Sequence, residues 1–155
     1  MQRWLERTCL IATLAGMPLV HEAWGAPITI GNTQALAFGK FASGSGGTIT
    51  VSPSGERTAT GGVMLVSSSG GAAAGFSIAG DPNLTYAVTL PGSGAVSGSG
   101  GQTMSLSHFS SNLTSGGQLN ASGQQTLSIG ATLSVGANQT PDSYSSSFVV
   151  FVDYN

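Results

Sequence analysis

Short runs in which apolar and polar residues alternate, each ended by glycine or by a serine–glycine pair, constrain this chain more than any other feature. An amphipathic helix needs an apolar residue every three or four positions, and repeated glycine destabilises it. No stretch after residue 26 keeps that spacing. Alternation with period two is typical of a β-strand that buries one face. We therefore predict that the chain after residue 26 folds from strands alone.

Nine segments carry a strand pattern, and clusters of glycine, proline, asparagine or serine separate them. They are residues 27–30, 35–41, 48–52, 62–67, 75–79, 85–90, 103–109, 126–135 and 144–154. Many short strands with no helix between them are typical of an antiparallel sandwich or barrel. We expect one all-β domain with one of these two antiparallel architectures.

The first 25 residues have the composition of a secretory signal peptide. Two arginines precede an apolar stretch over residues 9–20, and small residues occupy the −3 and −1 positions before a cleavage site between Gly25 and Ala26. The apolar stretch is shorter than the roughly 20 residues of a spanning helix, and a proline interrupts it. We expect cleavage after Gly25, export from the cytoplasm and no membrane span once the leader is removed.

Few residues of this chain could carry chemistry. Charged residues are 6% of the total and the net charge is −2, so we expect no nucleic-acid partner. His108 is the only histidine after residue 25, and it occupies a polar position of an alternating run. No histidine or cysteine pair has the spacing of a metal site, and no glycine cluster matches a phosphate-binding loop. We expect no catalytic, cofactor-binding or metal-binding residue and no enzymatic activity.

The segment 144–154 is predicted to be a strand with two apolar faces. Phe148, Val150, Val152 and Tyr154 share one face, and two further large apolar residues lie between them on the other. Such a strand fits the centre of a sandwich. It also fits an edge that another chain covers.

The alternation that leads to the penultimate residue, Tyr154, resembles the final strand of bacterial chaperone–usher pilins. Residues 26–155 also resemble an uncharacterised family of secreted bacterial domains associated with such pili. The matching stretches are residues 36–41, 46–51, 61–65, 130–135 and 144–155. The resemblance implies an immunoglobulin-like antiparallel β-sandwich that lacks its last strand. A periplasmic chaperone supplies that strand first, and the N-terminal extension of the next subunit supplies it later. Because that contact is head-to-tail and does not close, it implies a fibre.

The resemblance divides the chain into a signal peptide at residues 1–25, a possible donor-strand extension at 26–34 and a pilin-like domain at 35–155. The donor side chains would be Ile28 and Ile30. The acceptor edge would consist of Phe148, Val150, Val152 and Tyr154.

The partners implied are neighbouring copies or related pilin subunits, a periplasmic chaperone and an outer-membrane usher. The protein would pass through the periplasm to the cell surface and become part of a fimbria. The alternative is a monomeric secreted or surface-attached β-sandwich that binds carbohydrate or protein. That alternative predicts aromatic residues on exposed loops, whereas Tyr86, Phe109 and Tyr144 fall in predicted strands.

Overall fold

The computed structural model describes residues 25–114 and 116–155, and this part of the chain is built from antiparallel strands. The strands are β1 (Thr29–Gln34), β2 (Phe41–Ala42), β3 (Gly47–Val51), β4 (Arg57–Gly61), β5 (Met64–Leu65), β6 (Ala74–Ala79), β7 (Thr85–Thr89), β8 (Gly94–Ser97), β9 (Thr103–Ser111), β10 (Gly117–Gln118), β11 (Gln124–Val135) and β12 (Phe151–Tyr154). The prediction of an all-β antiparallel fold is confirmed. The described residues include no helix that could cross a membrane. The predicted leader lies outside them except for Gly25.

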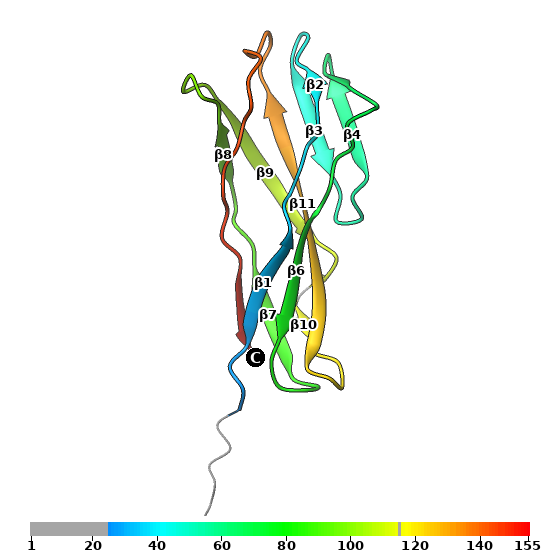
Figure 1. Cartoon of the computed structure of the whole chain (residues 1–155), viewed down its shortest axis with the longest axis vertical. Coiled ribbons are helices and arrows are strands. Elements are labelled where there is room, and N and C mark those ends of the chain that lie inside the picture. The colour runs from blue at the N-terminus through cyan, green and yellow to red at the C-terminus, as the bar shows by residue number, and fades with distance from the viewer. Residues whose placement is uncertain (1–24, 115) are drawn as a thin grey trace, which may run out of the picture.

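Three sheets curl around one long axis (Figure 1). The largest has the order β1-β6-β11-β3-β4, and β9 pairs with both β11 and β8. The second sheet has the order β10-β7-β12, and β2 pairs with β5 in the third. Strand β1 is therefore paired with β6, and β12 with β7.

Strand β11 organises the fold because it contacts both halves of the large sheet. Residues 124–129 pair with β6, residues 131–135 pair with β3, and β9 pairs with residues 129–134. Its inward positions are Leu127, Ile129, Ala131, Leu133 and Val135, and all five are buried. At Gly130 the chain changes partner from β6 to β3, and a Cβ there would clash with the main chain of Val51. Glycine permits this close approach of two backbones.

A bulge in β9 turns Phe109 toward the interior. Met104 and Leu106 face inward on even positions, but the register with β11 shifts between the pairs of Ser110 and Ser107. His108 lies in this bulge with a φ of 49° and is exposed. The extra residue in the bulge switches the inward-facing positions of β9 from even to odd numbers. Phe109 therefore packs against the core.

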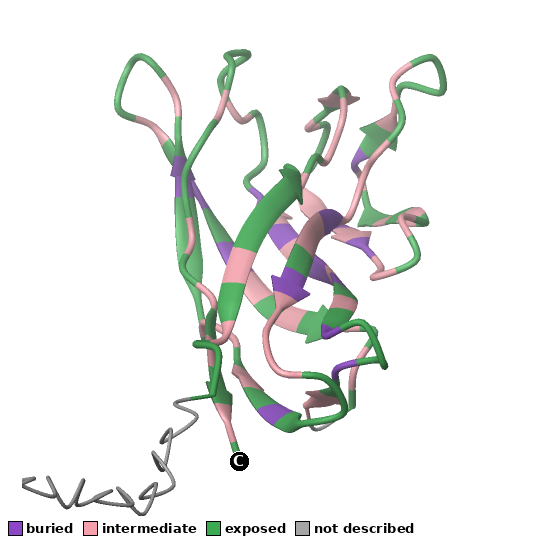
Figure 2. Ribbon diagram, turned by 60° about the horizontal axis from the view of Figure 1, so that its bottom comes forward, coloured by how far each residue is buried: buried purple, intermediate pink, exposed green. Residues whose placement is uncertain are grey.

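The core consists of two hydrophobic clusters stacked along the axis. The upper cluster comprises Ile49, Val63, Val96, Met104, Leu106, Leu133 and Val135. The lower cluster comprises Ala74, Ile78, Tyr86, Leu119, Leu127 and Ile129. Figure 2 shows the buried positions as short bands within the strands, with exposed loops at the end of the molecule that holds the upper cluster.

Candidate functional site

An apolar groove of about 1120 Å³ opens between two segments that lie far apart in the sequence. One wall is residues 35–44, here called the N-terminal wall. The other is residues 139–148, here called the C-terminal wall. The floor is formed by Ala74, Phe76, Val96, Met104, Leu106 and Leu133. The groove thus lies mainly over the upper cluster.

Each wall pairs with the fold on one side. Ala37 pairs with Ala72, and β2 pairs with β5, so the N-terminal wall follows residues 64–72. Ser145 exchanges two main-chain hydrogen bonds of 3.1 Å with Ser97, so the C-terminal wall follows β8. The edges of both walls that face the groove lack a strand partner among the described residues.

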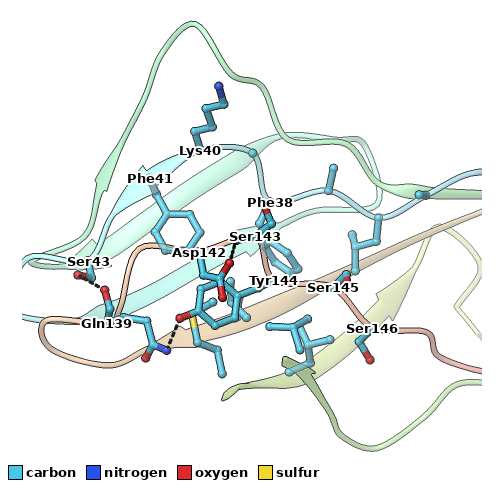
Figure 3. A pocket seen from close by; sticks show the side chains of 18 of the residues that line it. Phe38, Lys40, Phe41, Ser43, Gln139, Asp142, Ser143, Tyr144, Ser145 and Ser146 are labelled. Carbon is cyan, nitrogen blue, oxygen red and sulfur yellow. Dashed lines mark hydrogen bonds between the residues drawn. The ribbon is translucent and has the colours of Figure 1, made fainter. Parts of the chain in front are cut away.

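Hydrogen bonds join the walls, or the strands that continue them, only at or beyond the two ends of the groove. At one end the N–H of Asn138 donates to the oxygen of Gly44 at 3.1 Å, and the hydroxyl of Ser43 donates to the oxygen of Gln139 at 3.5 Å (Figure 3). At the other end the hydroxyl of Tyr154 donates to the oxygen of Ala26 at 3.0 Å. Between these points, no hydrogen bond within residues 25–114 and 116–155 crosses from residues 27–42 to residues 140–153. The groove is therefore a gap between two antiparallel edges.

Aromatic side chains from both walls lie over the groove. Figure 3 shows Phe38 and Phe41 on one wall and Tyr144 on the other, whereas Lys40 points away from the cavity. All three aromatic residues pack against the upper cluster. The hydroxyl of Tyr144 donates to the oxygen of Thr140 at 2.6 Å, which fixes the ring within its own wall. The polar atom of this ring is thus satisfied without a bond across the groove.

The predicted acceptor residues face the interior in the order that alternation suggested. Phe148, Val150, Val152 and Tyr154 are half-buried against the lower cluster. Phe148 lines the groove and packs on Phe109 with ring centroids 5.3 Å apart. The other three continue below the groove along β12. Their assignment as an acceptor edge stays a prediction.

The opposite face of this segment points to solvent. Val149 is 62% exposed and Phe151 is 61% exposed. We expected both faces of this segment to be covered. Within the described residues, only the inner face is covered.

The predicted donor residues lie in the chain's own sheet. Ile30 pairs with Ile78 across β1 and β6, and Ile28 immediately precedes β1. Both isoleucines are half-buried against the lower cluster. Residues 29–34 thus form an edge strand of this molecule. Their donation to another subunit stays a prediction that requires β1 to leave β6.

The predicted cleavage position lies beside a small polar cluster. Gly25 and Ala26 are exposed, and the nitrogen of Ala26 donates to Oδ1 of Asp81 at 2.9 Å. The main-chain nitrogen of Asp81 donates to the hydroxyl of Tyr154 at 2.6 Å. These bonds tie the start of the described chain, the β6–β7 loop and β12 together.

Two charged residues that the sequence did not single out hold the walls. Arg57 donates to the carbonyl oxygens of Phe38 at 2.9 Å and Lys40 at 3.3 Å. Asp142 accepts from the N–H of Ser99 at 2.6 Å and from its hydroxyl at 2.7 Å. The Ser99 hydroxyl, together with the N–H groups around the carboxylate, holds the pKa of Asp142 below its ordinary value. The sequence feature that could have identified them is the rarity of charged residues, since Arg57 is the only arginine after residue 7.

The described part of the chain has few other groups that bear on a metal site or on proton transfer. No group of three or more histidine, cysteine, aspartate or glutamate residues there could hold a metal ion. His108 bonds the hydroxyl of its neighbour Ser107 at 3.0 Å, on the exposed surface. Tyr86 is fully buried and its hydroxyl has no hydrogen-bond partner. Burial raises the pKa of this hydroxyl.

Comparison with known proteins identifies one family. The family model described as a domain of unknown function, DUF4402, matches residues 28–154. No curated protein and no solved structure matches the chain significantly. The expectation of an uncharacterised domain family is confirmed, and the likeness to pilin subunits stays a prediction. Because the match spans nearly all of the described residues, the chain belongs to the DUF4402 family of domains of unknown function.

Proposed function

We propose that the chain is a structural subunit of a bacterial surface fibre, assembled when an extended strand of another subunit enters the groove. The observation that carries this proposal is an apolar gap between two strand edges that face each other without pairing. Strand addition to open edges is a recurrent mode of protein recognition. The role is structural, and it requires no cofactor.

The main chain supports strand addition at both walls. Successive residues of an extended strand present their N–H and C=O groups to opposite sides. Because Ser145 bonds to Ser97, the main-chain groups of Tyr144 and Ser146 face the groove. By the same alternation the pair of Ala37 with Ala72 directs the main-chain groups of Leu36 toward it. Since the walls run antiparallel, an added strand lies parallel to one and antiparallel to the other.

The size of the groove fits a short strand. A strand occupies roughly 160 Å³ per residue, from a rise of about 3.4 Å, a strand spacing of about 4.8 Å and a sheet spacing of about 10 Å. The 1120 Å³ of the groove therefore accommodates about seven residues. Three large apolar side chains placed on the floor would contribute roughly 5–9 kcal/mol before the cost of ordering the strand.

Residues 26–34 of a neighbouring copy remain the proposed donor. Of the six residues of β1, Ile30 alone is half-buried and the other five are exposed, so β1 has little side-chain burial to lose when it leaves β6. The exchange would follow transfer by a periplasmic chaperone and an outer-membrane usher. The monomeric alternative gains no specific support, because Tyr86 is buried and Phe109 and Tyr144 are half-buried.

The experiment uses the full chain and a synthetic peptide of residues 26–34, with a scrambled peptide as control. The proposal predicts that the 26–34 peptide raises the melting temperature and that the scrambled peptide does not. Ser146→Pro removes an N–H at the groove edge and should abolish the effect, whereas Ser146→Ala keeps the N–H and should retain it. Equal melting temperatures with both peptides would contradict the donor assignment.

A disulfide tests whether β1 must leave its own sheet. Gly31 and Ser77 are directly opposed across β1 and β6, and a Cβ at Gly31 would meet nothing within 4 Å. Opposed residues of antiparallel strands have Cα atoms about 4.5–5.5 Å apart, within the range of a disulfide. The pair Gly31→Cys and Ser77→Cys should block polymerisation when oxidised and restore it when reduced. Polymers formed by the oxidised protein would exclude β1 as the donor.

A further inference from the structure

We propose that Arg57 and Asp142 are positioning residues that hold the two walls of the groove apart, so that the groove stands open before a strand enters. This inference rests on the proposed function, because it concerns how the same groove admits its strand. Arg57 bonds the N-terminal wall from β4, and Asp142, which belongs to the C-terminal wall, bonds the loop between β8 and β9.

Arg57 anchors the N-terminal wall to the strand pair behind it. Its guanidinium donates to three carbonyl oxygens, those of Phe38, Lys40 and Val66. Gly39 has a φ of 67°, and a Cβ there would clash with Nη1 of Arg57. This conformation places the carbonyls of Phe38 and Lys40 on the same guanidinium. It also shifts the alternation of inward-facing and outward-facing residues along the wall by one position, so that Phe38 and Phe41 both pack on the upper cluster.

Asp142 anchors the C-terminal wall to the loop between β8 and β9. Its Oδ2 accepts hydrogen bonds from the N–H and hydroxyl of Ser99 and from the N–H of Gly100 at 3.4 Å. Its Oδ1 accepts from the N–H of Ser143 at 2.7 Å. The loop lies at residues 98–102, so the wall is held from the side of β8, on which Ser145 also pairs with Ser97.

The distribution of charge is a second observation. The charged side chains of the described residues are Lys40, Glu56, Arg57, Asp81, Asp142 and Asp153. Arg57 bonds one wall, Asp142 anchors the other wall to the loop beside it, and Asp81 bonds Ala26 beyond the lower end of the groove. Three of the six charged side chains in the described residues therefore bond main-chain groups beside the groove or beyond its lower end.

Opposed anchors are needed because, within the described residues, no hydrogen bond spans the groove between its upper end, where Ser43 bonds Gln139, and its lower end, where Tyr154 bonds Ala26. Apolar walls over an apolar floor lower their free energy when they close and expel water. A groove that closes presents its edges only for a fraction of the time, and association slows in proportion to that fraction. Arg57 and Asp142 oppose closure from the two sides.

The first measurement is the distance between the walls in the full chain. Spin labels are attached at Ala42→Cys and Ser147→Cys in a Cys9→Ser background, and the distance is read by pulsed electron paramagnetic resonance. Both labelled positions are exposed. Arg57→Met and Asp142→Asn should each shorten or broaden the distance distribution. The matched controls Lys40→Met and Asp153→Asn, which remove the same charges, should leave it unchanged.

The second measurement is the association rate of the 26–34 peptide. Arg57→Met and Asp142→Asn should each lower the association rate constant by about tenfold or more and leave the dissociation rate constant unchanged. Asp142→Glu, which keeps the carboxylate, should recover part of the association rate. If unaltered protein takes up the peptide and the variants match it in distance and rate, the positioning role is overturned while the proposed function stands. If the unaltered protein takes up no peptide, the proposed function and the positioning role are both overturned. Should Arg57→Met fail to fold, the exposed Asp142 still supplies the test.

Discussion

The hydroxyl of Tyr154 donates a hydrogen bond of 3.0 Å to the carbonyl oxygen of Ala26, two residues that are 128 positions apart. The same hydroxyl accepts from the N–H of Asp81 at 2.6 Å. A Cβ on Gly80 would clash with this hydroxyl, so the glycine makes room for the tyrosine. Tyr154 therefore closes the lower end of the gap between the first and last strands.

Tyr154→Phe should lower the free energy of unfolding by about 1–2 kcal/mol, because two hydrogen bonds of about 1 kcal/mol each are lost while the ring remains. Urea unfolding followed by circular dichroism measures the change. An unchanged midpoint would show that this bond does not close the fold.

Tyr86→Phe is the matched control, since its hydroxyl is buried without a partner. We expect equal or greater stability at neutral pH, because an unsatisfied buried hydroxyl costs about 1–3 kcal/mol. Burial raises the pKa of Tyr86, so its folded form keeps the proton to a higher pH than its unfolded form. Stability should fall as the pH rises above about 10, the ordinary value for tyrosine, and Tyr86→Phe should lack this component. A variant with an identical alkaline profile would contradict the assignment.

Acid should loosen the C-terminal wall. The pKa of Asp142 is lowered, above all by the Ser99 hydroxyl, so its contribution is complete above the ordinary value of aspartate and is lost as the pH falls through the lowered value. The protection of the Ser99 and Gly100 amides against exchange, measured relative to the intrinsic rate at each pH, should fall over that range, and in Asp142→Asn it should be low at every pH. Slow exchange of both amides in the variant would show that the carboxylate does not hold the loop.

A pair of glycines tests the shape of the N-terminal wall. Gly39→Ala should destabilise by about 1–3 kcal/mol, because φ is positive and the Cβ meets the oxygens of Gly70 at 2.6 Å and Ser69 at 2.7 Å. Gly31→Ala, where a Cβ meets nothing within 4 Å, should be neutral or slightly stabilising. Thermal unfolding compares the two. Similar losses in both would mean that the kink at Gly39 is not required.

The strands that the sequence predicted best are those with large apolar residues at alternate positions. Residues 126–135 lie within β11, and all five inward residues from Leu127 to Val135 are buried, because neighbours on both edges and a packed face hold them in one register. Strands β4 and β8, and the two-residue strand β10, were missed. Strand β4 alternates threonine with Arg57 and Ala59, and β8 has Val96 as its one large apolar residue. Their pairing with β3 and β9 forms these strands, and no local pattern encodes it.

The groove shows the limit of sequence reasoning more clearly. Alternation indicated the inward face of the C-terminal segment, but the predicted strand at 144–154 is reduced to β12 and a single bridge at Ser145. The pairing with residues 86–97 slips by two residues between Ser145 and Phe151, which interrupts the ladder. The roles of Arg57 and Asp142 depend on loops that meet only in three dimensions. The predicted donor segment lies in β1, where Ile30 pairs with Ile78 of the neighbouring strand β6.

Amide hydrogen exchange along the C-terminal wall tests the central claim most directly. The N–H of Ser145 already bonds to Ser97, so by strand alternation we expect those of Tyr144 and Ser146 to face the groove. When a strand is added, by the 26–34 peptide or in the assembled fibre, exchange at Tyr144 and Ser146 should slow by about tenfold or more, and exchange at Ser145 should change little. Exchange at Tyr144 and Ser146 that stays as fast in the fibre as in the free chain would contradict the account.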